Sequence, residues 1–261
     1  MTMRDLLVRG LISGLLAATL AMGFASLVGE PEVDAAIAFE QRAAGDHGTS
    51  AMPGMPQAGT PAAAAPEEVS RPLQKSIGLA TAIGVMGLAF GGTFALLFAV
   101  AYGRVGLGVR GTALLIALAA FGAVYLVPSL KYAPNPPATG NPDTIAVRTQ
   151  LYFALMLVSL VATIGAAVIA RNLGERMSSW NAVLIALGAL AVVLVVAFLA
   201  LPGYDEEPEG FPANVLWRFR LASLGTQFVL WAGIGLIFGA LSERLEARAG
   251  RSTATAAPVR A

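Results

Sequence analysis

The sequence contains no cysteine and a single histidine, His47. Without cysteine the chain cannot form a disulfide, a thiolate metal site or a cysteine nucleophile. With one histidine, a three-histidine zinc site or a histidine relay within one chain is also excluded. Charged residues are scarce as well: they make up 13% of the 261 residues, whereas soluble globular domains carry about 25%. These absences argue against a soluble protein.

Long uncharged runs take the place of the missing charges. Hydrophobic residues make up 56% of the chain, and its mean hydropathy is +0.70. Roughly 20 apolar residues are needed to cross a bilayer as an α-helix. Six uncharged runs reach that length, at residues 10–29, 76–103, 111–130, 149–170, 177–204 and 221–242. The sequence therefore predicts an all-α, polytopic transmembrane helical bundle of six spans, which leaves no room for a soluble catalytic domain.

The first run has a second interpretation, as a secretory signal peptide. It follows Arg4 and Arg9, and it contains the small-residue sequence Gly23-Phe24-Ala25, which resembles a cleavage site. The run is longer than the apolar part of a usual signal peptide, so we predict an uncleaved transmembrane helix over residues 1–29. Cleavage would leave five spans and would not change the orientation of the others.

The distribution of charge predicts the orientation of the spans. If the spans alternate in direction, ten Lys and Arg residues lie on the side of the N-terminus and seven lie on the other side. The ten also lie in shorter segments, so the positive-inside rule places both termini in the cytoplasm. Acidic residues show a larger skew, with four inside and twelve outside. Because acids contribute little to topology, their accumulation outside needs another explanation.

The segments between the spans have distinct compositions. Residues 30–75 form an acidic periplasmic loop rich in Pro, Ala and Gly, which begins with a short amphipathic helix, EPEVDAAIAFEQ, and continues as a mobile linker. Residues 76–242 form a bundle of five helices, whose outer loops at 131–143 and 202–212 are kept from helix by their prolines. Residues 243–261 are expected to be a disordered cytoplasmic tail.

Glycines recur at helical spacing in three of the runs, which predicts faces where helix backbones approach closely. Lipid offers no hydrophobic drive for helices to associate, so small residues favour association by letting backbones meet. The glycines concerned are Gly10 and Gly14 in the first run, Gly84, Gly87 and Gly91 in the second, and Gly235 and Gly239 in the last.

The last run begins after two arginines, Arg218 and Arg220, and keeps polar residues on one face. Arg220, Ser223 and Gln227 are spaced i, i+3 and i+7, so a helix places them on the same side. Polar groups are costly against lipid, so this face should look at protein or at a hydrated cavity. Either hydrogen bonding between helices or the lining of a permeation path would account for it.

The outer acids form a second group of candidates. Carboxylate oxygens attract divalent cations and can coordinate them, although acidic loops are often only solvated. His47, with Met52 and Met55 nearby, adds softer donors that suit Co, Ni, Cu or Zn, or belongs to a linker with incidental residues. The candidate metal ligands are Glu30, Glu32, Glu40, His47, Asp205 and Glu206.

Two segments carry a resemblance to a known family. LVPSLKYAPNPPATGNPDTIAVRTQLYF, residues 126–153, and EEPEGFPANVLWRFRLASLGTQFVLW, residues 206–231, resemble the signature segments of the CbtA family of cobalt transporter subunits. The stretch EPEVDAAIAFEQ resembles, more loosely, the region after the family's first helix. The resemblance implies a multi-pass protein of the bacterial inner membrane that works with a small partner, CbtB, which has one span and a His-rich tail. The candidates for the structure of a path or entrance are Asn135, Asp143, Arg148, Arg220, Ser223 and Gln227.

Together these features predict a membrane subunit of an uptake system for cobalt. Acidic outer loops would gather the cation as a transported substrate, with no permanently bound cofactor. Arg220 would hold a loop acid in place, because an arginine repels cations. The alternatives are a scaffold for a metal-binding partner and a transporter for nickel or copper, since some relatives have a richer His stretch where this chain has only His47.

An enzyme is disfavoured. The chain has no ATP-binding GxxxxGK[ST] loop, and an intramembrane enzyme acting on lipid would have only outer carboxylates for acid–base work. A homo-oligomer is compatible with the glycine faces, and no nucleic-acid partner is expected.

Overall fold

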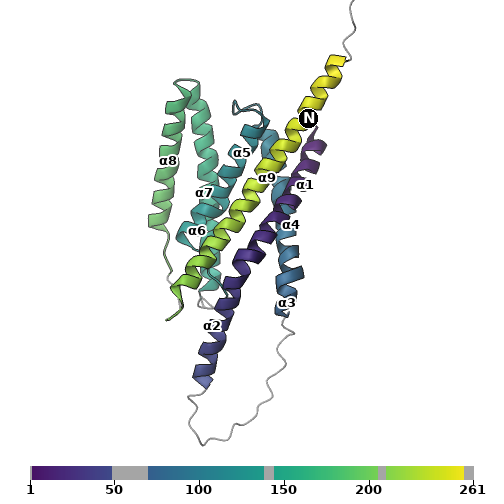
Figure 1. Cartoon of the computed structure of the whole chain (residues 1–261). Coiled ribbons are helices and arrows are strands. Elements are labelled where there is room, and N and C mark those ends of the chain that lie inside the picture. Colours follow the sequence, from purple (N-terminus) through teal and green to yellow (C-terminus); the bar gives the residue numbers. More distant parts are fainter. Residues whose placement is uncertain (1, 49–69, 138–143, 205–209, 256–261) are drawn as a thin grey trace, which may run out of the picture.

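The computed structural model describes residues 2–48, 70–137, 144–204 and 210–255, and every regular element within these ranges is a helix (Figure 1). The elements are α1 (Met3–Phe24), η1 (Ala25–Gly29), α2 (Glu30–Gly48), α3 (Arg71–Leu73), η2 (Gln74–Gly78), α4 (Leu79–Ala101), α5 (Val109–Ala120), η3 (Phe121–Leu126), α6 (Val127–Lys131), α7 (Ile145–Gly174), α8 (Ser179–Ala200) and α9 (Ala213–Thr255). Six helical segments among them are long and apolar enough to cross a membrane, namely Met3–Arg42, Lys75–Ala101, Val109–Lys131, Ile145–Gly174, Ser179–Ala200 and Ala213–Glu246. The predicted all-α bundle of six spans is therefore confirmed.

Two helices are longer than the sequence predicts. α1, η1 and α2 follow one another without a break from Met3 to Gly48, so the amphipathic stretch that begins at residue 30 continues the first span as helix. α9 continues past residue 242, where the sequence analysis expects a disordered tail to begin, and ends at Thr255. These two extensions project from opposite ends of the bundle (Figure 1).

Local sequence explains several helix ends. Thr2 and Asp5 form a capping box at the start of α1, where the Asp5 backbone N–H donates to the Thr2 hydroxyl at 3.2 Å and the Thr2 N–H donates to the Asp5 carboxylate at 3.3 Å. Ser178 caps α8 by accepting from the Asn181 backbone N–H. The turn at 102–108 holds Gly103 at φ +78°, a left-handed backbone that favours glycine. This turn reverses the chain between α4 and α5.

Three segments, η1, η2 and η3, are wound as π-helix, and each lies beside a proline. Pro31 follows η1, Pro128 follows η3, and Pro72 precedes η2. Pro31 and Pro128 lie inside a continuous helix, where proline has no N–H to donate to the carbonyl four residues earlier, and a wider π-turn is one way in which the helix absorbs the lost bond. Pro72 is in the first turn of α3, where no such bond is lost. Each π-segment lies near one end of its span, next to a short or extending helix: η1 is next to α2, η2 is next to α3, and η3 is next to α6.

α1 packs against α4 through glycines, with almost no side chain between the two backbones. A Cβ atom added at Gly10 or Gly14 would overlap the carbonyl oxygen of Gly91 or Gly87, and the converse holds on α4. This close approach is the geometry that stabilises transmembrane helix pairs. The predicted glycine faces are confirmed here except at Gly84, where an added Cβ would meet open space.

α9 packs on another side of α1 and also on α5. A Cβ added at Gly233 would lie 2.9 Å from the Ala17 Cβ on α1, and one added at Gly235 would lie 2.6 Å from the Ala117 Cβ on α5. We call α1, α4, α5 and α9 the glycine core. Because α1 lies between α4 and α9, signal cleavage would remove the centre of this core, which favours a retained first helix.

Aromatic rings fill the space beside the glycines. Phe238 of α9 makes edge-to-face contacts with Phe94 and Phe98 of α4, with ring centroids 5.2 and 4.9 Å apart, and all three side chains are fully buried. Trp231 stacks on Phe90 at 4.8 Å. Such pairs contribute about 0.5–1.5 kcal/mol beyond the area they bury. They therefore stabilise one relative position of α4 and α9 along their axes.

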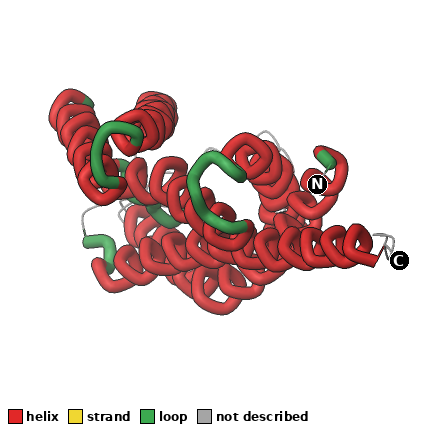
Figure 2. Tube along the Cα trace, turned by 90° about the horizontal axis from the view of Figure 1, so that it is seen from above, coloured by secondary structure: helices red, strands yellow, loops and turns green. Residues whose placement is uncertain are grey.

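α7 and α8 form a hairpin that is set off to one side of the glycine core (Figures 1 and 2). α8 packs mainly against α7, and α7 reaches the core through η3 and α6. Large apolar side chains cover the outside of the hairpin, and Leu199 is 82% exposed. In a bilayer this surface contacts lipid. The few buried residues of the hairpin are Leu155, Ser159, Ala166, Ala182 and Ala186.

Candidate functional site

The charged side chains of the spans gather at the two ends of the bundle. We name the two ends after the orientation that the charge distribution predicts. The inner end carries the start of α1 and the turns at 102–108 and 175–178, and the outer end carries α2, η2, residues 132–137 and the start of α9 (Figure 1). Within the described ranges no charged residue is buried, and the buried polar residues are Ser13, Thr112, Ser159 and Ser242. A site that handles ions is therefore expected at an end of the bundle.

At the outer end, Arg220 joins α9 to the segment after α6. Its guanidinium Nη2 donates a hydrogen bond to the Asn135 side-chain carbonyl at 3.0 Å, and both residues are half-buried. Arg220 also makes further interactions. Asn135 belongs to the Asn-Pro-Pro sequence, whose prolines keep residues 135–137 out of a helix. Arg220 thus holds an irregular segment against the end of a transmembrane helix.

One turn further into the membrane, Ser223 joins α9 to η3. Its hydroxyl lies 2.7 Å from the hydroxyl of the buried Tyr125, and either oxygen can donate. Gln227, on the next turn, is half-buried. Ser223 therefore makes a hydrogen bond between helices, which is one of the two roles that the sequence allows for the polar face of α9, while Arg220 bonds to the irregular segment after α6. Sequence reasoning missed Tyr125, whose direction depends on the π-turn that Pro128 accompanies.

Two acids of α2 are paired with cations of the chain. Glu32 lies 3.8 Å from the Arg218 guanidinium, and only 14% of its side chain is exposed. Asp34 forms an ion pair with Lys75, which ties α2 to η2. A metal ion would have to displace Arg218 to bind Glu32. Glu32 is therefore a weaker candidate ligand than a carboxylate without such a neighbour.

The other candidate residues are spread over the outer end. Glu40 is exposed on α2, while Glu30 and Arg148 are half-buried at the starts of α2 and α7 and make further interactions. His47 lies in α2, but its side chain is outside the described part, as are Asp143, Asp205 and Glu206. Among the described residues, no three His, Asp or Glu side chains come together as a group that could hold a metal ion.

Lys131 and Tyr132 attach the hairpin to the rest of the outer end. The Lys131 ammonium donates to the Phe198 carbonyl of α8 at 2.8 Å, and the Tyr132 hydroxyl donates to the Pro202 carbonyl at 2.8 Å. Burial raises the pKa of Tyr132, and the neighbouring Tyr204 adds to this effect. Tyr132 therefore stays a neutral donor at physiological pH.

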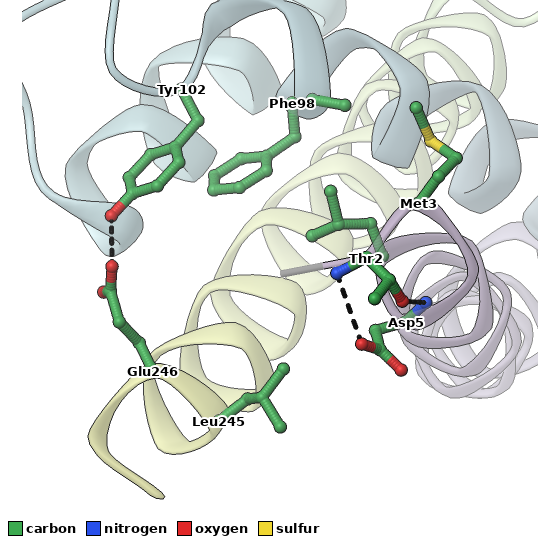
Figure 3. Close-up of a pocket in the computed structure, with 9 residues that line it drawn as sticks. Thr2, Met3, Asp5, Phe98, Tyr102, Leu245 and Glu246 are labelled. Carbon is green, nitrogen blue, oxygen red and sulfur yellow. Dashed lines mark hydrogen bonds between the residues drawn. The ribbon is translucent and has the colours of Figure 1, made fainter. Parts of the chain in front are cut away.

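The inner end contains two cavities that involve the start of α1. The larger, about 630 Å³, is lined by Thr2, Asp5, Phe98, Tyr102 and Glu246 among others (Figure 3). The Tyr102 hydroxyl donates to Glu246 at 2.6 Å, and this hydrogen bond raises the pKa of Tyr102. The second, about 540 Å³, lies between α1 and α9.

Six membrane-crossing helices, with charged residues confined to the ends and a polar cluster joining helices at one end, define a multi-pass helical membrane protein. Residues 3–243 match the family described as "probable cobalt transporter subunit (CbtA)", and the chain belongs to this family. No curated protein and no solved structure matches the chain. The family indicates metal transport, with cobalt as the cargo, and points away from an enzyme; the word subunit implies a partner.

Proposed function

We propose that the protein is a bacterial inner-membrane subunit of a cobalt uptake system, with its outer end facing the periplasm as the metal entrance. The contact between Arg220 and Asn135 supports this assignment of the entrance more than any other observation. It joins the two segments that most resemble the family, one around the Asn-Pro-Pro sequence and one at the start of α9. The two segments therefore form one structural element at the outer end of the bundle, which explains why one has Asn135 beside two prolines and the other has Arg220 at the start of a transmembrane helix.

The acids of this end gather the cation, and the arginines organise the protein around it. Carboxylates concentrate divalent cations and offer oxygen ligands. Glu40, which is exposed, Glu30, and the loop acids Asp205 and Glu206 are suited to this task. Glu32 is held by Arg218 and contributes mainly to structure. Arg220, which would repel a cation, braces the wall of the entrance together with Ser223.

The chain needs help to move the metal onward. It has no ATP-binding GxxxxGK[ST] loop, so active transport draws on an ion gradient or on another subunit. The proposed partner is a small single-span, His-rich subunit like CbtB, because imidazoles suit cobalt and this chain has only His47.

The proposal is tested by uptake of radiolabelled cobalt in a strain that lacks other cobalt importers, with and without the partner. The triple variant Glu30→Ala, Glu40→Ala, Asp205→Ala should reduce uptake severalfold at low cobalt and recover at high cobalt, because capture is lost and the bundle is not. The matched control neutralises three inner-end acids, Glu175, Glu243 and Glu246, and should leave cobalt capture unchanged. Normal uptake by the outer triple variant would show that these acids do not gather metal.

A second role, as a membrane scaffold for the metal-binding partner, is favoured by one observation. The described interior of the bundle holds four buried polar residues and no charged one, so it offers few ligands for an ion in mid-membrane. A scaffold predicts that purified protein in liposomes moves no cobalt alone and that the partner supplies the path. The same assay with nickel and copper as competitors identifies the cargo.

A further inference from the structure

A cationic side chain lies partly buried near the inner end of α1. Arg9 directly precedes the uncharged run of the first span, and its Nη1 atom is buried without a hydrogen-bond partner in the part of the chain that the structure describes. A guanidinium remains charged at any physiological pH. A donor nitrogen that is shielded from water and has no acceptor loses the free energy of a hydrogen bond, so this atom favours an anionic or strongly accepting group.

Arg9 lines the 540 Å³ cavity between α1 and α9. The other lining residues are of two kinds, charged at the inner rim and apolar towards the membrane. They are Arg4, Asp5, Val8, Ile12 and Leu241. The cavity therefore combines two guanidinium groups with an apolar surface that continues along α1, where Val8 and Ile12 are both about half exposed.

The protein's own acids near the cavity are already engaged. Asp5 accepts from the Thr2 backbone N–H in the capping box and attracts Arg9 and Arg4 through space. Glu243 pairs with Arg110, and Glu246 accepts from Tyr102. Two arginines against one carboxylate leave the cavity lining with a net charge of +1 (2 − 1). Charge complementarity thus calls for an anion.

We propose that this cavity binds the phosphate of an anionic phospholipid. Arg9 and Arg4 contact the phosphate oxygens, and an acyl chain follows Val8, Ile12 and Leu241 towards the bilayer interior. The depth is suitable because Arg9 stands where the uncharged run begins, as a headgroup stands above its acyl chains. Basic pockets between transmembrane helices on the cytoplasmic side are typical sites for anionic headgroups. A lipid held there would bridge α1 and α9 at the inner end of the glycine core.

The test uses the purified full-length protein in detergent and needs no transport measurement, so it is independent of the proposed function. Phosphatidylglycerol, phosphatidylcholine and inorganic phosphate are added separately, and the unfolding temperature and the lipid adducts in native mass spectrometry are recorded. Phosphatidylglycerol should raise the unfolding temperature and form a saturable adduct, whereas phosphatidylcholine and phosphate should do neither. An equal effect of inorganic phosphate would overturn the lipid assignment in favour of a free anion.

Variants localise the effect. Arg9→Gln should weaken phosphatidylglycerol binding about tenfold, because it removes a charge-assisted contact, and should not lower the unfolding temperature without lipid, since it removes a guanidinium nitrogen that has no acceptor. Arg4→Gln, at an exposed position, should fold normally and weaken binding less. Arg176→Gln, an exposed inner-end arginine in the α7–α8 turn, is the matched control and should bind like the original. Unchanged binding by both Arg4→Gln and Arg9→Gln, or an equal response to phosphatidylcholine, would refute the site.

Discussion

The glycine core and the α7–α8 hairpin are both made of apolar transmembrane helices, yet they are built differently. In the core, α1 and α4 approach so closely that a methyl group on Gly14 would overlap the Gly87 carbonyl. In the hairpin, a Cβ added at Gly165 or Gly188 would meet no atom within 4 Å. The same residue type therefore determines helix packing in one region and is structurally neutral in the other.

This difference indicates how the two regions are stabilised. Backbone contact through small residues substitutes in lipid for the missing hydrophobic drive, and the core uses it on three of its helices. The hairpin relies on contacts between α7 and α8 and on polar bonds at the outer end, from Lys131 and Tyr132 to the carbonyls of Phe198 and Pro202. We expect the core to be the rigid part and the hairpin to be the part that can move.

The largest effect is expected from Gly14→Ala. The added methyl group must push α1 and α4 apart, and overpacking of this kind costs about 1–3 kcal/mol or more. The unfolding temperature in detergent should fall sharply, and the yield of folded protein should fall with it. Gly165→Ala in α7 is the matched control and should be neutral or slightly stabilising, because alanine has the higher helix propensity. Equal losses for the two variants would show that the core has no special packing.

A smaller and more local effect is expected from Lys131→Met. The substitution keeps the apolar stem but removes the ammonium that donates to Phe198 in α8. Hydrogen exchange should increase at the outer end of α8 and remain unchanged in α1 and α4. Lys75→Met is the matched control, because Lys75 also forms an outer-end ion pair but joins α2 to η2. Faster exchange throughout the core after Lys131→Met would mean that hairpin and core are one cooperative unit.

The sequence predicted the faces of the core better than the partners of those faces. The spacing of Gly10 and Gly14 identified a small-residue face, and the structure places Gly87 and Gly91 opposite. Spacing shows which residues share a side of a helix, but it does not show which helix that side meets. Gly84 has the same spacing on α4, yet a Cβ added there would meet no atom within 4 Å.

The outer end shows the same limit. The spacing of Arg220 and Ser223 on one face could be read from the sequence, whereas their partners Asn135 and Tyr125 lie 85 and 98 residues away. The direction of the Tyr125 side chain also depends on the π-turn of η3, which no periodicity reveals. The pairing of Glu32 with Arg218 follows from the unbroken continuation of α1 into α2. Composition indicated that the outer segments are rich in acids, but it did not show which of these acids form ion pairs with Lys or Arg of the same chain.

The hydrogen bond between Tyr125 and Ser223 lies where the hairpin joins the glycine core, because η3 contacts both α7 and α9. Removing it measures how strongly this junction is held. Tyr125→Phe and Ser223→Ala should each lower the free energy of unfolding by roughly 1 kcal/mol, as side-chain hydrogen bonds between membrane helices do. The double variant should cost less than the sum of the single ones, since both remove the same bond. Strict additivity would show that the two hydroxyls do not depend on each other.

The smallest effect is expected from an ion pair that is short but exposed to solvent. Arg110 and Glu243 join α5 to α9 at the inner end with 2.5 Å between nitrogen and oxygen, but their side chains are 64% and 47% exposed. An exposed ion pair contributes roughly 0.2–1 kcal/mol, and salt weakens it. Glu243→Gln should therefore shift the unfolding temperature little at low salt and not at all at high salt, while Gly14→Ala remains destabilising at both. A large, salt-sensitive loss in Glu243→Gln would mean that charge at the inner end, rather than backbone contact between helices, stabilises the glycine core.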